Sequence, residues 1–162
     1  MHDLRKLSYQ LHPPMLEEAG LETALRARLD SYTRSTGMTA SLEASELGRL
    51  PAELELTIFR VVEEALANVE LHSGIATSRI SIELGPQSSS DGVVLEVETG
   101  VSGVPSKGSF GALIKRMTAT TTGRGLGLAR MRERVRRIGG SLEISATSNR
   151  TTVRATFPVT LA

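Results

Sequence analysis

The sequence contains no cysteine and no tryptophan, and aromatic residues make up only 3% of its 162 positions. The lack of cysteine excludes disulfides and thiolate metal sites, and it is typical of a cytoplasmic protein. Such a low aromatic content leaves no platform on which nucleic-acid bases could stack. No hydrophobic run is long enough to cross a bilayer, and no signal-peptide pattern opens the chain. We therefore expect this chain to contact neither nucleic acid nor a membrane.

The charge is almost balanced, because 19 Lys and Arg residues face 18 Asp and Glu residues for a formal net charge of +1. No global field therefore draws the chain to a polyanion. One local group of basic residues follows Leu128, on a helix with an apolar stripe, and we interpret it as a solvated face and not as a nucleic-acid patch. The group consists of Arg130, Arg132, Arg134, Arg136 and Arg137.

The main glycine motif is Gly123-Arg124-Gly125-Leu126-Gly127, directly before a predicted helix. Alternating glycines leave backbone N–H groups uncovered, and the first helical turn adds unpaired N–H donors and the positive end of the helix dipole. Such an arrangement is typical of a phosphate cradle. By itself the motif is also compatible with a glycine-rich turn that caps a helix. The polar run Thr118–Thr122 before it is no hydrophobic strand, which disfavours a dinucleotide-binding fold.

The longest predicted helix begins at Pro51 and carries apolar residues at helical spacing on one face. A polar line runs beside that face through Glu64, Asn68 and His72, each four residues after the last. Polar residues along the border of a core face are candidate site residues. Separately, they are also compatible with surface or capping residues and with a hydrogen-bonded buried amide.

The remaining pattern predicts a helix between Gly20 and Gly37 and five short strands. From Thr99 to Thr122 no period persists, and so long a segment without regular structure is often a functional lid. At the start, Pro13-Pro14 ends a helical segment, so we expect the chain to begin within or just after a longer helix. The predicted strands are Met38–Leu42, Arg79–Leu84, Val93–Val97, Leu142–Ser145 and Thr152–Phe157.

Five motifs together resemble those of sensor histidine kinases of the nitrate-sensor and lipid-sensor type, in order and spacing, over nearly the whole chain. The motifs are Leu7-Ser8-Tyr9-Gln10-Leu11-His12-Pro13-Pro14-Met15-Leu16, Gly20-Leu21, Glu64-Ala65-Leu66-Ala67-Asn68 with His72, the glycine cradle with Met131-Arg132-Glu133-Arg134-Val135, and Gly139-Gly140. The resemblance implies an α/β two-layer sandwich, the Bergerat fold, in which helices cover one face of a mixed sheet. It also implies that residues 1–14 end a dimerisation helix or linker and that residues 15–162 form the ATP-binding catalytic domain.

The resemblance assigns roles to the site residues. Asn68 occupies the position of the ligand to Mg²⁺, and an amide oxygen suits that hard cation. Glu64 would polarise water or orient the metal shell, and His72 would lie near the nucleotide or under the lid of about Val104–Thr122. The second glycine box would hold the phosphates, with Gly123, Gly125, Leu126 and Gly127 in the loop and Arg124 adding charge or pointing to solvent.

The first glycine box departs from the family pattern. An ungapped match places Thr99 where the family has the aspartate that reads adenine, and Gly103 at the last glycine of the box. Glu98 is adjacent, but strand alternation directs it to the opposite face. Thr99 can still accept a hydrogen bond from the adenine amino group. In addition, Leu71 replaces the basic residue that usually precedes the histidine.

The resemblance implies that the domain binds ATP and Mg²⁺ and transfers the γ-phosphoryl group to a histidine. His2-Asp3 resembles the phosphoacceptor pair, but it lies too close to Pro13-Pro14 to leave room for the helical hairpin expected between them. We therefore place the phosphoacceptor on an upstream dimerisation domain of the same protein, with a response regulator as the next partner. Two alternatives stay open: a degenerate module of this fold that regulates or binds a partner without ATP turnover, and an anti-sigma-type serine kinase, which His12-Pro13-Pro14 disfavours.

Overall fold

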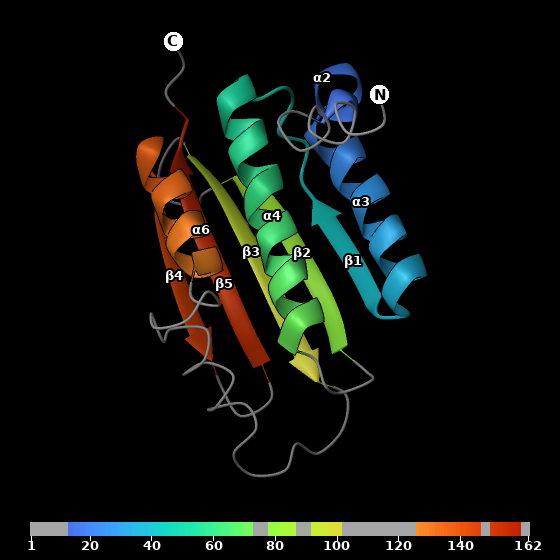
Figure 1. The fold of residues 1–162 in the computed structure, drawn as a ribbon. Helices are drawn as coiled ribbons and strands as arrows, with labels where there is room; N and C mark the ends of the chain where they lie inside the picture. Colours follow the sequence, from blue (N-terminus) through green and yellow to red (C-terminus); the bar gives the residue numbers. More distant parts are fainter. Residues whose placement is uncertain (1–12, 73–77, 87–91, 102–125, 147–149, 160–162) are drawn as a thin grey trace, which may run out of the picture.

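The computed structural model describes residues 13–72, 78–86, 92–101, 126–146 and 150–159. These residues form two layers, a five-stranded sheet and a set of helices that all cover the same face of it (Figure 1). The predicted two-layer α/β sandwich is therefore confirmed.

The sheet is mixed, as predicted. Its spatial order is β1 (Thr39–Ala44), β2 (Ser78–Pro86), β3 (Gly92–Val101), β5 (Arg150–Pro158) and β4 (Ser141–Ala146). Strands β1 and β2 run parallel, whereas the other neighbours pair antiparallel. A parallel pair needs a crossover connection, and α4 (Ala52–His72) supplies it.

Strand β3 is longer than predicted. It continues past Val97 to Val101, so the expectation of an irregular segment starting at Thr99 is wrong at its beginning. Thr99 and Gly100 pair with β2 on one side and with β5 on the other. Glycine weakens a strand on its own, but two neighbouring ladders hold this one in place. Residues 102–125, including the proposed lid and Gly103, lie outside the described residues.

The first two helices meet at a glycine. Helix α2 (Pro14–Ala19) ends and α3 (Leu21–Thr36) begins at Gly20, whose φ of 86° is readily reached only without a side chain. The α3 helix ends at Gly37 in the left-handed conformation, where its N–H group donates to the carbonyl of Thr33. Both glycine boundaries of the predicted helix are therefore confirmed.

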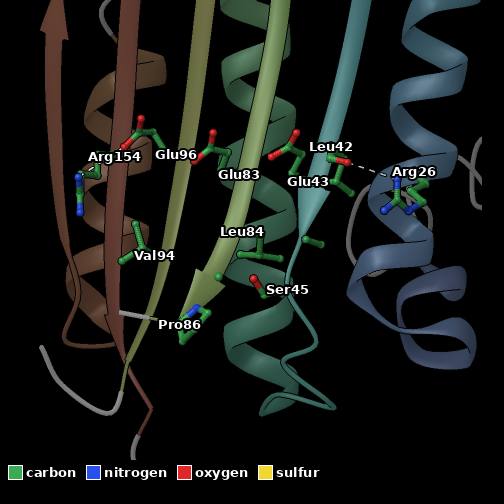
Figure 2. A pocket seen from close by; sticks show the side chains of 12 residues that line it. Arg26, Leu42, Glu43, Ser45, Glu83, Leu84, Pro86, Val94, Glu96 and Arg154 are labelled. Atoms are coloured by element: carbon green, nitrogen blue, oxygen red, sulfur yellow. Dashed lines mark hydrogen bonds and ion pairs between the residues drawn. The ribbon is translucent and has the colours of Figure 1, made fainter. Parts of the chain in front are cut away.

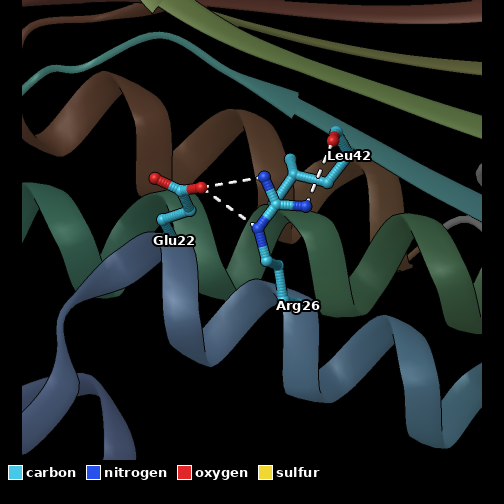
Figure 3. Close-up of polar contacts among 3 residues, drawn as sticks. All are labelled: Glu22, Arg26 and Leu42. Atoms are coloured by element: carbon cyan, nitrogen blue, oxygen red, sulfur yellow. Dashed lines mark hydrogen bonds and ion pairs between the residues drawn. The ribbon is translucent and has the colours of Figure 1, made fainter.

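An arginine ties α3 to the edge strand. Arg26 donates through Nε and Nη2 to Oε1 of Glu22 at 3.0 and 2.8 Å, and through Nη1 to the carbonyl oxygen of Leu42 in β1 at 3.4 Å (Figure 3). The Arg26 and Glu22 side chains are half exposed, so this contact orients the helix and adds little stability.

Alternate residues of each strand face the helices and form the core. On β3 these are Val93, Leu95 and Val97, none of which is more than 3% exposed. Helix α4 places Ile58, Val62 and Leu66 against them, all fully buried. Helix α6 (Leu126–Arg137) adds a narrower stripe of Leu128, Met131 and Val135.

The five arginines of α6 are exposed, as the interpretation of a solvated face predicted. Arg137 pairs with Glu133 one turn earlier, with 3.3 Å between Nε and Oε1. The helix ends in a Schellman motif, in which the N–H groups of Gly139 and Gly140 donate to the carbonyls of Arg136 and Val135. No helix in the described ranges is long and apolar enough to cross a membrane.

Candidate functional site

Glu64 and Asn68 of the polar line lie where α4 meets α6. Glu64 is half-buried, and Asn68 is only 8% exposed. Within the described part of the chain, Nδ2 of Asn68 is buried and has no hydrogen-bond partner. Leaving such a group unsatisfied costs about 1–3 kcal/mol. Because Nδ2 is a donor, a hydrogen-bond acceptor on a ligand, such as a phosphate oxygen, could satisfy it.

Gly127 brings the first turn of α6 directly against this pair. A Cβ atom at Gly127 would lie closer to Oε1 of Glu64 than real Cβ atoms come, and 3.2 Å from Oδ1 of Asn68. A carboxylate oxygen, an amide oxygen and the start of a helix therefore converge at one point. The unpaired N–H groups of a first helical turn attract anions, whereas the Glu64 carboxylate repels them.

A divalent cation bound with a phosphate would resolve this conflict, and Glu64 and Asn68 are the described residues that could hold it. Carboxylate and amide oxygens are the ligands that Mg²⁺ prefers, and Mg²⁺ usually takes few protein ligands and keeps water or phosphate oxygens for the others. The described residues contain no group of three or more His, Cys, Asp or Glu side chains placed to hold a metal. Glu64 and Asn68 therefore fit a metal that arrives with a phosphate ligand better than a closed protein site.

Thr99 lies near the end of β3 on the helix-covered face, next to Thr151 of β5. Its hydroxyl donates to the backbone carbonyl of Thr151 at 3.2 Å, which leaves the oxygen lone pairs of Thr99 available. Thr151 is 3% exposed, and its own Oγ1 is buried without a partner among the described residues. Thr151 is therefore a second unsatisfied polar group, which the sequence pattern did not single out.

These two groups of residues lie at the same end of the molecule. The end of α4, the end of β3 and the start of β5 lie at the lower end in Figure 1, and α6 begins at its own lower end, higher up beside α4. The structure thus brings together Glu64, Asn68 and Gly127, and it places Thr99 at the same end of the sheet.

The other predicted site residues lie outside the description. Gly103, Gly123, Arg124 and Gly125 belong to a segment that the structure does not describe. His72 ends α4 and Leu126 begins α6, but their side chains are likewise not described. Their assigned roles stay predictions.

A pocket on the opposite, open face of the sheet is a poor site for a polyphosphate (Figure 2). Glu43, Glu83 and Glu96 stand in register on three adjacent strands along it. Arg154 approaches Glu96 with 3.5 Å between Nη1 and Oε2. Carboxylates therefore outnumber the arginines that line this pocket, and the pocket repels anions.

A mixed sheet covered on one face by helices, with a buried asparagine on one helix against Gly127 at the start of another, fits a nucleotide-binding α/β ATPase. The family model described as histidine kinase-, DNA gyrase B-, and HSP90-like ATPase matches residues 53–161, more than half of the chain. The chain therefore belongs to this family, whose description implies ATP as the ligand.

Curated relatives place the chain near sensor histidine kinases within the family. It is 31% identical over 157 residues to the sensor histidine kinase MctS of Rhizobium johnstonii, a match that covers 96% of this chain and 31% of MctS. It is 32% identical to the sensor histidine kinase NarS of Mycobacterium tuberculosis, covering 96% of this chain and 33% of NarS. The chain thus spans about a third of the length of these two relatives. The resemblance to sensor histidine kinases that the sequence motifs indicated is confirmed.

The solved structures agree on the fold. The histidine kinase domain of the blue-light activated histidine kinase from Erythrobacter litoralis superposes with a TM-score of 0.65 at 19% identity. The match covers 86% of this chain and 61% of that domain. At that identity the likeness supports the fold alone.

Replacement of Gly127 by alanine is expected to displace the Glu64 carboxylate. Because the colliding atom is the end of a flexible side chain, the fold should survive, and alanine favours a helix over glycine by up to about 1 kcal/mol. We expect an unchanged or slightly raised Tm in thermal unfolding, with Mg-nucleotide affinity about 10-fold weaker by calorimetry.

The control is the double variant that combines Gly127→Ala with Glu64→Ala. If the added methyl group acts through Glu64, the double variant should bind no more weakly than Glu64→Ala alone. If the double variant instead loses the sum of the binding free energies lost in the two single variants, the methyl group at Gly127 acts independently of Glu64.

Proposed function

We propose that this chain is the ATP-binding catalytic domain of a sensor histidine kinase. It binds Mg-ATP between the Asn68 end of α4 and the start of α6, and it supplies the γ-phosphoryl group to a histidine on a separate helical domain. The observation that supports this function most is the convergence of Asn68 Oδ1, the Glu64 carboxylate and Gly127, together with a buried Asn68 Nδ2 that has no partner among the described residues. Family membership and the similarity to sensor histidine kinases support it independently.

In this proposal Asn68 and Glu64 would hold the Mg²⁺ that accompanies the nucleotide. When bound, Mg²⁺ neutralises charge on the phosphates and so eases transfer of the terminal one. Glu64 also orients water around the site, and backbone N–H groups of the Gly123–Gly127 loop hold phosphate oxygens. The chain's contribution to the reaction is positioning and charge, since phosphoryl transfer asks for little covalent chemistry from the protein.

We further propose the roles that the family pattern assigns to the remaining positions. His72 contacts the nucleotide or the lid, Gly103 belongs to the first glycine box, and Arg124 adds positive charge beside the phosphates. Residues 1–14 connect to the dimerisation helix that carries the phosphoacceptor, and a response regulator receives the phosphoryl group afterwards.

Calorimetric titration with the non-hydrolysable imido analogue of ATP, with and without Mg²⁺, tests nucleotide binding. We expect micromolar affinity that depends on Mg²⁺. Phosphohistidine should then form on a phosphoacceptor domain added in trans together with ATP, and not on this chain alone. Phosphohistidine on the isolated chain would contradict the proposed place of the acceptor.

A degenerate regulatory module of the same fold is the second candidate. Thr99 favours it, because the hydroxyl that stands at the position of the family's carboxylate already donates to the Thr151 carbonyl. Folded protein that shows no binding at millimolar analogue would favour this module over a kinase domain.

A further inference from the structure

The two edges of the sheet differ in how they are protected. β1 and β4 are the edge strands, and an edge strand leaves backbone N–H and C=O groups without a partner on its outer side. At the β1 edge, α3 packs along the strand and Arg26 donates to the Leu42 carbonyl at 3.4 Å. At the β4 edge, β5 is the only described element that pairs with the strand. Among the described strands, β4 therefore has the open edge.

The sequence of β4 does not block the addition of a further strand. It contains no lysine and no proline, and its register with β5 is regular from Ser141 to Ala146, without a bulge. Leu142 and Ile144 lie on the helix-covered face and are only half-buried, whereas Glu143 is exposed on the open face. An added strand would therefore cover the two aliphatic side chains and satisfy the outer backbone groups.

Two arginines of α6 lie beside this edge. Gly127 faces Glu64 and Asn68 of α4, so it marks the α4 side of the helix. At about 3.6 residues per turn, Arg132 and Arg136 lie on the other side of the buried stripe of α6. That side faces the β4 edge, because α6 lies between α4 and this edge of the sheet (Figure 1). Both arginines are exposed, and neither has a hydrogen bond or ion pair within the described part of the chain.

The spacing of the two arginines matches that of an extended chain. One helical turn separates them, a rise of about 6 Å, and side chains on one face of a strand recur about every 6.6–6.8 Å. A strand added to β4 therefore places successive side chains of one face beside Arg132 and Arg136. Carboxylates at these positions complete two ion pairs, and a neutral or basic side chain on the other face suits Glu143.

We propose that the β4 edge binds an extended acidic segment of a partner protein, which adds a further strand to the sheet. Acidic side chains of the segment face Arg132 and Arg136, and its backbone pairs with β4. A second copy of this chain fits less well, because two β4 strands paired in one continuous sheet bring the arginines of both α6 helices together. The nucleotide site takes no part in this contact, so its test does not depend on the proposed function.

Fluorescence anisotropy with a labelled decapeptide of alternating glutamate and threonine tests this surface. We expect saturable binding with a Kd of about 0.1 mM at physiological ionic strength, and at least about 10-fold weaker binding of the matching lysine–threonine peptide. The fully N-methylated acidic peptide keeps the carboxylates but has no backbone N–H and cannot approach the edge closely, so it should not bind. Hydrogen exchange of the β4 amides should slow when the acidic peptide binds.

The double variant Arg132→Gln/Arg136→Gln removes both charges. It should bind the acidic peptide about 5–20-fold more weakly, with an unchanged Tm because neither arginine has a partner to lose in the described chain. Arg130→Gln/Arg134→Gln is the matched control, because the same helical geometry places these exposed residues on the α4 side of α6. Physiological salt largely screens their charges from the β4 edge, so this variant should bind like the parent protein.

The outcomes separate strand addition from other kinds of binding. Weaker binding in the Arg132/Arg136 variant alone, with no binding of the N-methylated peptide, supports the proposal. Equal losses in the two double variants overturn it, because only the overall charge of α6 then attracts the peptide. Binding of the N-methylated peptide overturns the strand addition, and no binding of the acidic peptide at about 1 mM overturns the surface itself. Protection of the β4 amides that rises with protein concentration, without peptide, assigns the edge to a second copy instead.

Discussion

Replacement of Asn68 by alanine is expected to weaken binding of the Mg²⁺ complex of an ATP analogue by about 100-fold or more. The change removes the proposed amide ligand to the metal and leaves the Glu64 carboxylate facing the phosphates. Calorimetry with and without Mg²⁺ measures the effect, and the variant should lose the increase in affinity that Mg²⁺ produces. Asn68→Asp, which keeps an oxygen at this position, should retain part of the dependence on Mg²⁺.

Thr57→Ala is the matched control, since Thr57 lies on the same helix and is 8% exposed, as Asn68 is. It should bind nucleotide like the parent protein. Stability should change little in Asn68→Ala, because Nδ2 of Asn68 has no partner among the described residues to lose. An Asn68→Ala variant with the parent's affinity and Mg²⁺ dependence would exclude Asn68 as a ligand.

Replacement of Gly140 by alanine is expected to lower the free energy of unfolding by about 2–3 kcal/mol. Its Cβ atom would lie 2.5 Å from the backbone carbonyl oxygen of Thr156 and 2.8 Å from Cγ1 of Val135. A backbone atom cannot rotate away, so the junction between α6 and the β4–β5 pair has to shift. Thermal unfolding should show a Tm lower by roughly 4–12 °C.

Gly100→Ala is the control for this prediction. Neither Gly100 nor Gly140 has a positive φ, so alanine fits the backbone conformation at both positions. A Cβ atom at Gly100, however, meets nothing within 4 Å. Its Tm should therefore stay close to that of the parent protein. Equal losses in the two variants would mean that the loss of glycine itself, and not the collision at Gly140, destabilises the chain.

Local patterns were sufficient to predict most elements and the shared face of two residues of the candidate site. The apolar period of α4 and α6 predicted both helices, and the four-residue spacing of Glu64 and Asn68 predicted that their side chains share one face. The alternation of β3 predicted that Thr99 and Glu98 point to opposite faces, and their separate partners, Thr151 and Arg150, agree with it. Each of these inferences depends on residues within a few positions of one another.

Thr151 could not be found in the same way. Its neighbour Thr99 lies on another strand, and only the register between β3 and β5 places the two together. The end of β3 was mispredicted for a related reason, because Gly100 has a low strand propensity and is held in the strand by ladders on both sides.

The sequence by itself determined the periodic faces of the helices, the alternating faces of the strands and the glycines that end them, because these follow from backbone geometry and from nearby residues. Only the tertiary structure decided that the start of α6 meets Glu64 and Asn68 and that Thr99 stands beside Thr151. Those contacts join segments far apart in the chain, and the packing of helices on one sheet brings them together.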